Sequence, residues 1–121
     1  MSLIISTRYD GEIAIVHVQG ALTIGPALAA LKSRVERAVS EKSSTGLVLN
    51  LSGVAGMDSA GLGELLAIHS LATRNGFRVA LVRAAPRLKD MLAVTHIDGF
   101  FSFHDDEPSA VVALRHTAAA G

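Results

Sequence analysis

The chain contains no cysteine among its 121 residues. Disulfides, a thiolate nucleophile and a cysteine metal site are therefore excluded, which fits a reducing compartment. An excess of charge is also absent, since Lys plus Arg and Asp plus Glu each number 11. Without a net charge the chain has no global field to attract a polyanion, so direct nucleic-acid binding is not expected.

A targeting segment and an uninterrupted apolar run are missing as well. The N-terminus has no basic segment followed by an apolar stretch and a small-residue cleavage site, so we recognise no secretion signal and expect a cytoplasmic location. The longest charge-free stretch, Ile13 to Leu31, contains Gln19, Gly20 and Pro26 and alternates like a strand in its first half. A membrane span is therefore not expected.

Length and composition indicate one domain. A chain of 121 residues, half of them apolar, suits a single core and leaves little room for a second. We expect one domain over residues 1–121, with residues 118–121 as a frayed tail. The sequence leaves the oligomeric state open.

The clearest local pattern is a hairpin near the N-terminus. The pair Asp10-Gly11 separates two runs rich in β-forming residues, Leu3 to Tyr9 and Glu12 to Gln19. An Asp-Gly pair between such runs favours a tight turn, which makes the two predicted strands antiparallel neighbours. The second run alternates between an apolar face and a mixed face, and we expect helices to cover the apolar one.

After the hairpin, helical and strand patterns alternate. The expected helices run from Pro26 to about Lys42, from Asp58-Ser59 to Asn75-Gly76, from Pro86 to about Thr95, and onward from the acidic segment Asp105 to Pro108. The expected strands are Gly46 to Leu51, Phe77 to Val82 and Phe100 to His104. The order β-β-α-β-α-β-α-β-α predicts an α/β fold: a mixed, mostly parallel sheet of about five strands with about four helices packed on it.

The segment from Gly56 to Glu64 places a hydroxyl at the start of the second helix, directly after an apolar strand. A helix N-terminus carries unpaired N–H groups and partial positive charge. Ser59, or Asp58 beside it, is therefore a candidate helix cap. Alternatively, Ser59 is a phosphate acceptor whose modification changes which partner binds.

Two glycines stand inside this helix, Gly61 and Gly63. Each costs roughly 0.8 to 1 kcal/mol relative to alanine, so a compensating role is expected. Close packing of the helix against the sheet is one explanation. A flat surface on which a partner can lie is the other.

Enzyme motifs around Ser59 fail at defined positions. A nucleophile elbow needs glycine where Met57 stands, a P-loop needs lysine where Leu62 stands, and a dinucleotide fingerprint needs glycine where Leu66 stands. The five histidines show no metal-ligand spacing, so neither a metal nor a cofactor is expected. A small serine hydrolase is the least favoured hypothesis, and no catalytic residue is assigned.

The run from Asp58 to Glu64, placed after Leu47 to Leu51 and before an apolar helix, resembles the signature of STAS domains, specifically bacterial anti-sigma factor antagonists. The resemblance extends over nearly the whole chain. It implies a non-enzymatic regulator whose unphosphorylated form binds an anti-sigma factor that is also a serine-protein kinase. That kinase would phosphorylate Ser59 and so release the antagonist, and a serine phosphatase would reset it, so regulating sigma-factor-dependent transcription.

On this resemblance, the partner-binding surface around Ser59 comprises Thr23, Asp58, Gly61, Leu62 and Gly63. Thr23 departs from the family, in which many members carry an acidic residue in a Gly-x-Leu-Asp pattern. The departure leaves open whether the interface differs or the partner is not a standard kinase. The alternative function is a STAS scaffold or a phospholipid-transport accessory module that binds proteins without phosphorylation.

Overall fold

A computed structural model describes residues 3–40, 45–94 and 101–120 of the chain. Within these residues five strands form one sheet in the order β1-β2-β3-β4-β5. They are β1 (Ile4–Asp10), β2 (Ile13–Leu22), β3 (Gly46–Met57), β4 (Arg78–Val82) and β5 (Ser102–His104). The first pair is antiparallel and every later pair is parallel. The predicted mixed, mostly parallel sheet is confirmed.

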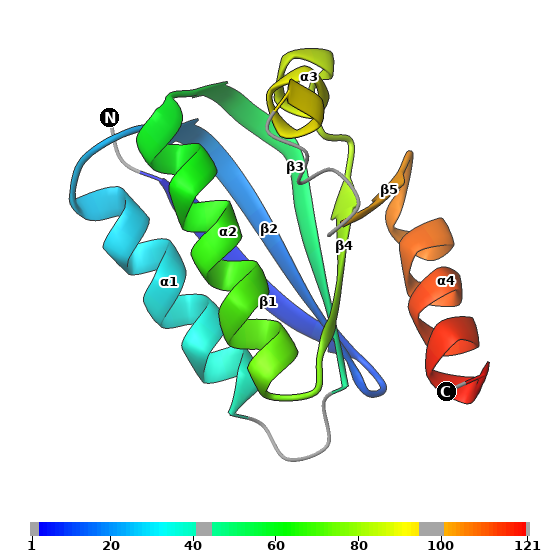
Figure 1. The fold of residues 1–121 in the computed structure, drawn as a ribbon. Coiled ribbons are helices and arrows are strands. Elements are labelled where there is room, and N and C mark those ends of the chain that lie inside the picture. Colours follow the sequence, from blue (N-terminus) through cyan, green and yellow to red (C-terminus); the bar gives the residue numbers. More distant parts are fainter. Residues whose placement is uncertain (1–2, 41–44, 95–100, 121) are drawn as a thin grey trace.

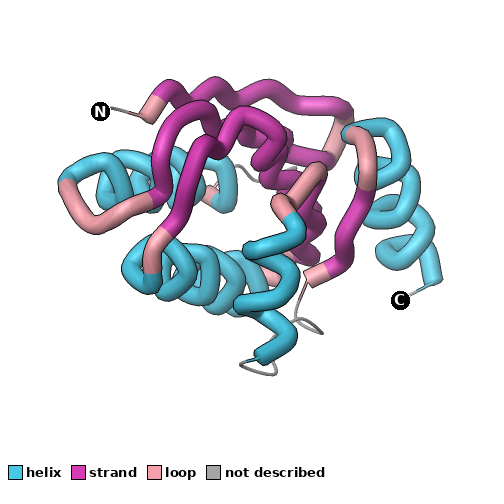
Figure 2. The backbone as a smooth tube through the Cα atoms, turned by 90° about the horizontal axis from the view of Figure 1, so that it is seen from above, coloured by secondary structure: helices cyan, strands magenta, loops and turns pink. Residues whose placement is uncertain are grey.

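Helices cover both faces of this sheet (Figure 1). They are α1 (Pro26–Val39), α2 (Ser59–Arg74), α3 (Pro86–Val94) and α4 (Glu107–Ala120). The long helices α1 and α2 lie side by side on one face, whereas α4 lies on the other, as the view along the sheet in Figure 2 shows. The predicted element order is confirmed.

The core is divided between the two faces by strand alternation. On β2, Ala14 and Val16 are buried in the larger cluster under α1 and α2, whereas Ile13 and Ile15 pack against α4 in a smaller cluster. The almost continuous apolar run at the start of β3 is buried on both sides, as expected for a central parallel strand. Burial of each large aliphatic side chain contributes roughly 1.5 to 3 kcal/mol.

The hairpin turn lies one residue later than predicted. Asp10 pairs with Ile13 at the end of the antiparallel ladder, so the two turn residues are Gly11 and Glu12. Gly11 has a φ of 58°. A positive φ at the first turn position favours glycine, which explains why the turn forms there and not at Asp10-Gly11.

Strand β3 is longer than predicted. It continues past Leu51 to Met57 because β2 also continues, to Leu22, and the two pair there through register shifts. A Cβ at Gly53 would lie 2.7 Å from Cγ of Gln19, so glycine permits this close pairing. Residues 52–57, which lie beyond the predicted strand, are therefore part of the sheet.

Most other boundaries agree with expectation. Helix α2 ends at Arg74 before the predicted stop at Asn75-Gly76, and β4 begins one residue after Phe77. The last strand is shorter than predicted and begins at Ser102. Lys42, Thr95 and Phe100 lie outside the described residues. Helix α4 is described as far as Ala120, and fraying of residues 118–121 stays a prediction.

No helix in the described part of the chain is long and apolar enough to cross a membrane.

Candidate functional site

The site lies at the carboxyl end of the parallel strands, where β2 and β3 end and α2 begins (Figure 1). Thr23 follows β2 directly, and Asp58 is the single residue between β3 and α2. Ser59 is the first residue of α2 and is exposed. Because carboxyl ends of parallel strands meet at one edge, these residues come together although 35 positions separate Thr23 from Asp58 in the sequence.

The Asp58 carboxylate joins the two loops of the site. Its Oδ1 accepts a hydrogen bond from the backbone N–H of Gly61 at 3.0 Å, which caps α2. Its Oδ2 accepts from the backbone N–H of Ile24 at 3.0 Å, in the loop between β2 and α1. The N–H of Ile24, and then that of Gly61, lower the pKa of the Asp58 carboxyl below its usual value. The carboxylate is therefore ionised at neutral pH and holds both loops together.

This geometry assigns the capping role to Asp58 and not to Ser59. The first turn of α2 receives its side-chain cap from Asp58. Within the described residues the Ser59 hydroxyl forms no hydrogen bond, and its side chain faces solvent. Ser59 is therefore not the cap of α2, and its hydroxyl is accessible at the N-terminus of this helix.

The two glycines of α2 have different surroundings. A Cβ at Gly61 would lie 2.1 Å from the carbonyl oxygen of Leu22 and 2.9 Å from Cγ of Met57. Gly61 is buried there, so it lets α2 approach the end of β2 closely. Gly63 is exposed, and a Cβ added to it would have no neighbouring atom within 4 Å. Close packing explains the first glycine, and a bare outer surface remains the explanation for the second.

Apolar side chains lie close to the start of α2. Ile24, held beside Asp58, is 81% exposed, and Leu62 on the first turn of α2 is half-buried. Thr23 is also half-buried. We call the region formed by Thr23, Ile24, Ser59, Leu62 and Gly63 the Ser59 surface. Asp58 supports it from its edge, and Gly61 sets its shape from beneath.

An apolar groove continues this surface toward α3. Its deeper part, about 170 Å³ in volume, lies between the end of β3 and α3 and is lined mainly by apolar side chains, with Met57 and Met91 among them. A shallower part joins Leu62 of α2 to Met91 and Val94 of α3. Val94 is 77% exposed. Ile24 and the α3 residues of the groove, Met91 and Val94, lie outside the motif around Ser59, which did not indicate them.

Glu64 lies one turn beyond Ser59 but belongs to a different environment. Burial raises the pKa of the Glu64 carboxyl above its usual value. The nearby Lys32 of α1 lowers this pKa by a smaller amount, and Glu36 of α1 raises it. The Oε2 atom of Glu64 is buried and has no hydrogen-bond partner among the described residues. Glu64 therefore lies between α1 and α2 and adds negative charge behind the start of α2.

Potential metal ligands do not gather in the part of the chain that the structure describes. In residues 3–40, 45–94 and 101–120 there is no group of three or more His, Cys, Asp or Glu side chains arranged to hold an ion. His104 instead shares a hydrogen bond of 3.0 Å with the Ser102 hydroxyl. His69 packs edge-on against Phe101, with ring centroids 5.1 Å apart.

Comparison with known proteins gives the same fold. An anti-sigma factor antagonist from Mycobacterium paratuberculosis is 27% identical, with a TM-score of 0.69 over 94% of this chain and 95% of that one. A putative anti-sigma factor antagonist from Thermotoga maritima is 21% identical, with a TM-score of 0.80 over 92% and 94%. The Bacillus cell fate determinant SpoIIAA in its phosphorylated form is 16% identical, with a TM-score of 0.72 over 91% and 98%.

The sequence profile of the STAS domain family matches residues 5–110, which include both the sheet and the Ser59 surface. The match agrees with the element order and with the placement of the Asp58-Ser59 pair at the start of α2. The chain therefore belongs to the STAS domain family.

Proposed function

We propose that this chain is an anti-sigma factor antagonist that binds its anti-sigma factor through the Ser59 surface and is released when Ser59 is phosphorylated. The observation that supports this proposal most strongly is that two neighbouring residues at the start of α2 have different roles. Asp58 caps the helix, which leaves the exposed Ser59 hydroxyl without a structural task. The anti-sigma factor antagonists among its structural relatives support the same class of partner.

The fold can accept a phosphate on Ser59 without unfolding. Phosphorylation adds about −1.5 to −2 charges at neutral pH. The N-terminal N–H groups and dipole of α2 favour negative charge at this position, whereas the ionised Asp58 and the charge on Glu64 oppose it. These opposing terms are each small at an exposed position, so the modified domain stays folded.

The same charge is unfavourable in a docked complex. The Ser59 surface includes the exposed Ile24 and is flanked by the apolar groove against α3. A partner covering these apolar groups would remove water from the phosphate, and an unpaired buried charge is costly. Phosphorylation therefore acts on the interface and not on the fold.

The substitution Ser59→Asp tests this mechanism. We expect at least about tenfold weaker binding to its anti-sigma factor partner, because a carboxylate is placed in the interface. The free energy of unfolding should change by less than about 1 kcal/mol, because the helix dipole and Asp58 act in opposite directions. Biolayer interferometry gives the affinity, and urea unfolding gives the stability.

Ser33→Asp is the matched control, since Ser33 is an exposed serine on α1 and lies outside the Ser59 surface. Its affinity for the partner should equal that of the unmodified chain. Tight binding retained by Ser59→Asp would contradict the proposed switch. That outcome would favour a scaffold or transport-accessory module that binds without phosphorylation.

A further inference from the structure

A second pocket lies between β1 and α1, toward the opposite end of the sheet from Ser59. It has a volume of about 280 Å³ and is lined by Thr7, Tyr9, Arg34, Arg37 and Ala38. Tyr9 stands just before the hairpin turn, and the two arginines lie roughly 12 to 17 Å along α1 from its start at Pro26. Since the loop before Pro26 is bonded to Asp58, this pocket is separate from the Ser59 surface.

The pocket concentrates positive charge. Arg34 and Arg37 are three residues apart on α1 and therefore project from the same side of the helix. No carboxylate in the described residues forms an ion pair with either of them, whereas Arg8 pairs with Glu107 on the other face. Two guanidinium groups that share one pocket, with no ion-paired carboxylate in the described part of the chain, favour an anion between them.

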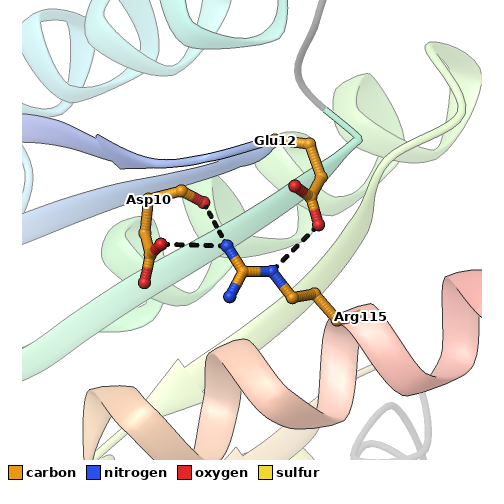
Figure 3. Close-up of polar contacts among 3 residues, drawn as sticks. All are labelled: Asp10, Glu12 and Arg115. Atoms are coloured by element: carbon orange, nitrogen blue, oxygen red, sulfur yellow. Dashed lines mark hydrogen bonds and ion pairs between the residues drawn. The ribbon is translucent and has the colours of Figure 1, made fainter.

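Strand alternation explains why the nearest carboxylate does not neutralise this charge. Thr7 and Tyr9 face α1, so Asp10 points to the opposite face of the sheet. There its Oδ1 accepts a hydrogen bond of 2.9 Å from Arg115, which also binds Glu12 at 3.0 Å (Figure 3). The carboxylates of Asp10 and Glu12 are thus both bound to Arg115, on the face of the sheet that α4 covers.

Hydroxyl groups complete the lining. The Thr7 Oγ1 atom is buried and has no hydrogen-bond partner among the described residues. A buried polar atom left unpaired costs roughly 1 to 3 kcal/mol, so a rotation of the Thr7 side chain that brings its hydroxyl to a ligand oxygen in the pocket would be favourable. Tyr9 supplies a second hydroxyl from the same face of β1.

We propose that this pocket binds the phosphate group of a phosphorylated ligand. Arg34 and Arg37 would donate charge-assisted hydrogen bonds to its oxygens, since the planar guanidinium fork matches phosphate geometry. Thr7 and Tyr9 would donate from the strand side. The volume lies near the lower end of the range for small-molecule sites, which fits a single phosphate group with a small attached moiety. A soluble phosphate ester and a lipid headgroup share this chemistry.

Pyrophosphate is the first probe, titrated into ¹⁵N-labelled full-length protein. We expect saturable amide shifts around Tyr9, Arg34 and Arg37. The double substitution Arg34→Gln/Arg37→Gln should weaken binding at least about tenfold. Arg74→Gln/Arg78→Gln is the matched control, because both of its arginines are exposed, lie outside the pocket and remove the same charge. It should leave the affinity nearly unchanged.

The substitution Thr7→Val tests the pocket without changing its charge. We expect this nearly isosteric change to raise the melting temperature, because it removes the unpaired buried hydroxyl, and to weaken pyrophosphate binding. Weaker binding with higher stability would support a ligand-contacting hydroxyl. Unchanged affinity would contradict the part assigned to Thr7.

Adenosine monophosphate and vesicles containing phosphatidylglycerol are the probes that distinguish a soluble phosphate ester from a lipid headgroup as the ligand. Loss of either interaction in Arg34→Gln/Arg37→Gln, with retention in the control, supports the pocket and assigns the soluble or the lipid ligand. Equal loss in both double variants, or no saturable binding of any probe, would overturn the proposal. Ser59→Asp should bind these probes like the unmodified chain, so the result is independent of the proposed partner switch.

Discussion

Replacing Gly61 by alanine gives a quantitative test of the contact between α2 and the end of β2. At an exposed helical position this change stabilises a protein by roughly 0.8 to 1.0 kcal/mol. At Gly61 the new Cβ would lie 2.1 Å from the Leu22 carbonyl oxygen. An ordinary contact between carbon and a carbonyl oxygen is about 3.3 Å, so the helix and the strand must separate by about 1 Å.

This separation acts on backbone and not on a flexible side chain, and it draws the Leu22 segment away from the Asp58 carboxylate that binds Ile24. Overpacking of this kind costs about 1 to 3 kcal/mol, which exceeds the gain in helix propensity. We therefore expect Gly61→Ala to reduce the free energy of unfolding by up to about 2 kcal/mol.

Gly63→Ala is the matched control two residues away in the same helix, where a Cβ has nothing within 4 Å. It should increase the free energy of unfolding by roughly 0.8 to 1.0 kcal/mol. Urea unfolding followed by circular dichroism at 222 nm measures both variants, and each 1 kcal/mol corresponds to about 4 °C in melting temperature for a domain of this size. Equal stabilisation by the two substitutions would refute the close contact assigned to Gly61.

Two carboxylates should have opposite pH signatures in urea unfolding. Because backbone N–H groups lower the folded-state pKa of Asp58, its stabilisation is complete above its unfolded pKa of about 3.9 and is lost as the pH falls through the lower folded value. Asp58→Asn should therefore be less stable than the unmodified chain at pH 7, with the difference narrowing in acid; a difference constant with pH would contradict an ionised cap. Burial raises the folded-state pKa of Glu64, so its favourable contribution is present below the unfolded pKa of about 4.3 and is lost as the pH rises through the folded value. Glu64→Gln should accordingly gain stability relative to the unmodified chain between pH 4 and pH 7, and a constant difference or a loss over that interval would contradict the raised pKa.

The element order could be predicted because its signals are local. The hairpin runs, the helix start at Pro26 and the stop at Asn75-Gly76 are each encoded within a few residues. The STAS match over residues 5–110 agrees with the resemblance carried by Asp58 to Glu64. The position of Ser59 at a helix start was likewise readable from the sequence.

Other features depend on contacts between distant segments. The extension of β3 from Leu51 to Met57 depends on the paired extension of β2 to Leu22. Sequence alone left two explanations for the helical glycines. The position of the Leu22 carbonyl oxygen distinguishes them, because it lies close to the buried Gly61 and not to the exposed Gly63. The part played by α3 in the groove follows from its position across the cavity from the end of β3, for which the sequence has no local signal.

The role of Asp58 illustrates the same limit at atomic scale. Asp58 and Ser59 are both of residue types that commonly cap helices. The choice is determined by the Ile24 N–H, which lies 34 positions earlier in the chain and gives the Asp58 carboxylate a second donor. That contact leaves the Ser59 hydroxyl available.

The most direct test of the proposed switch is intact mass spectrometry of the chain after incubation with a cognate anti-sigma factor kinase and Mg-ATP, followed by peptide mapping. We expect the addition of one phosphoryl group, located on Ser59, and no addition to the Ser59→Ala variant. An unmodified chain, or a phosphoryl group on another residue with Ser59 unmodified, would contradict the account.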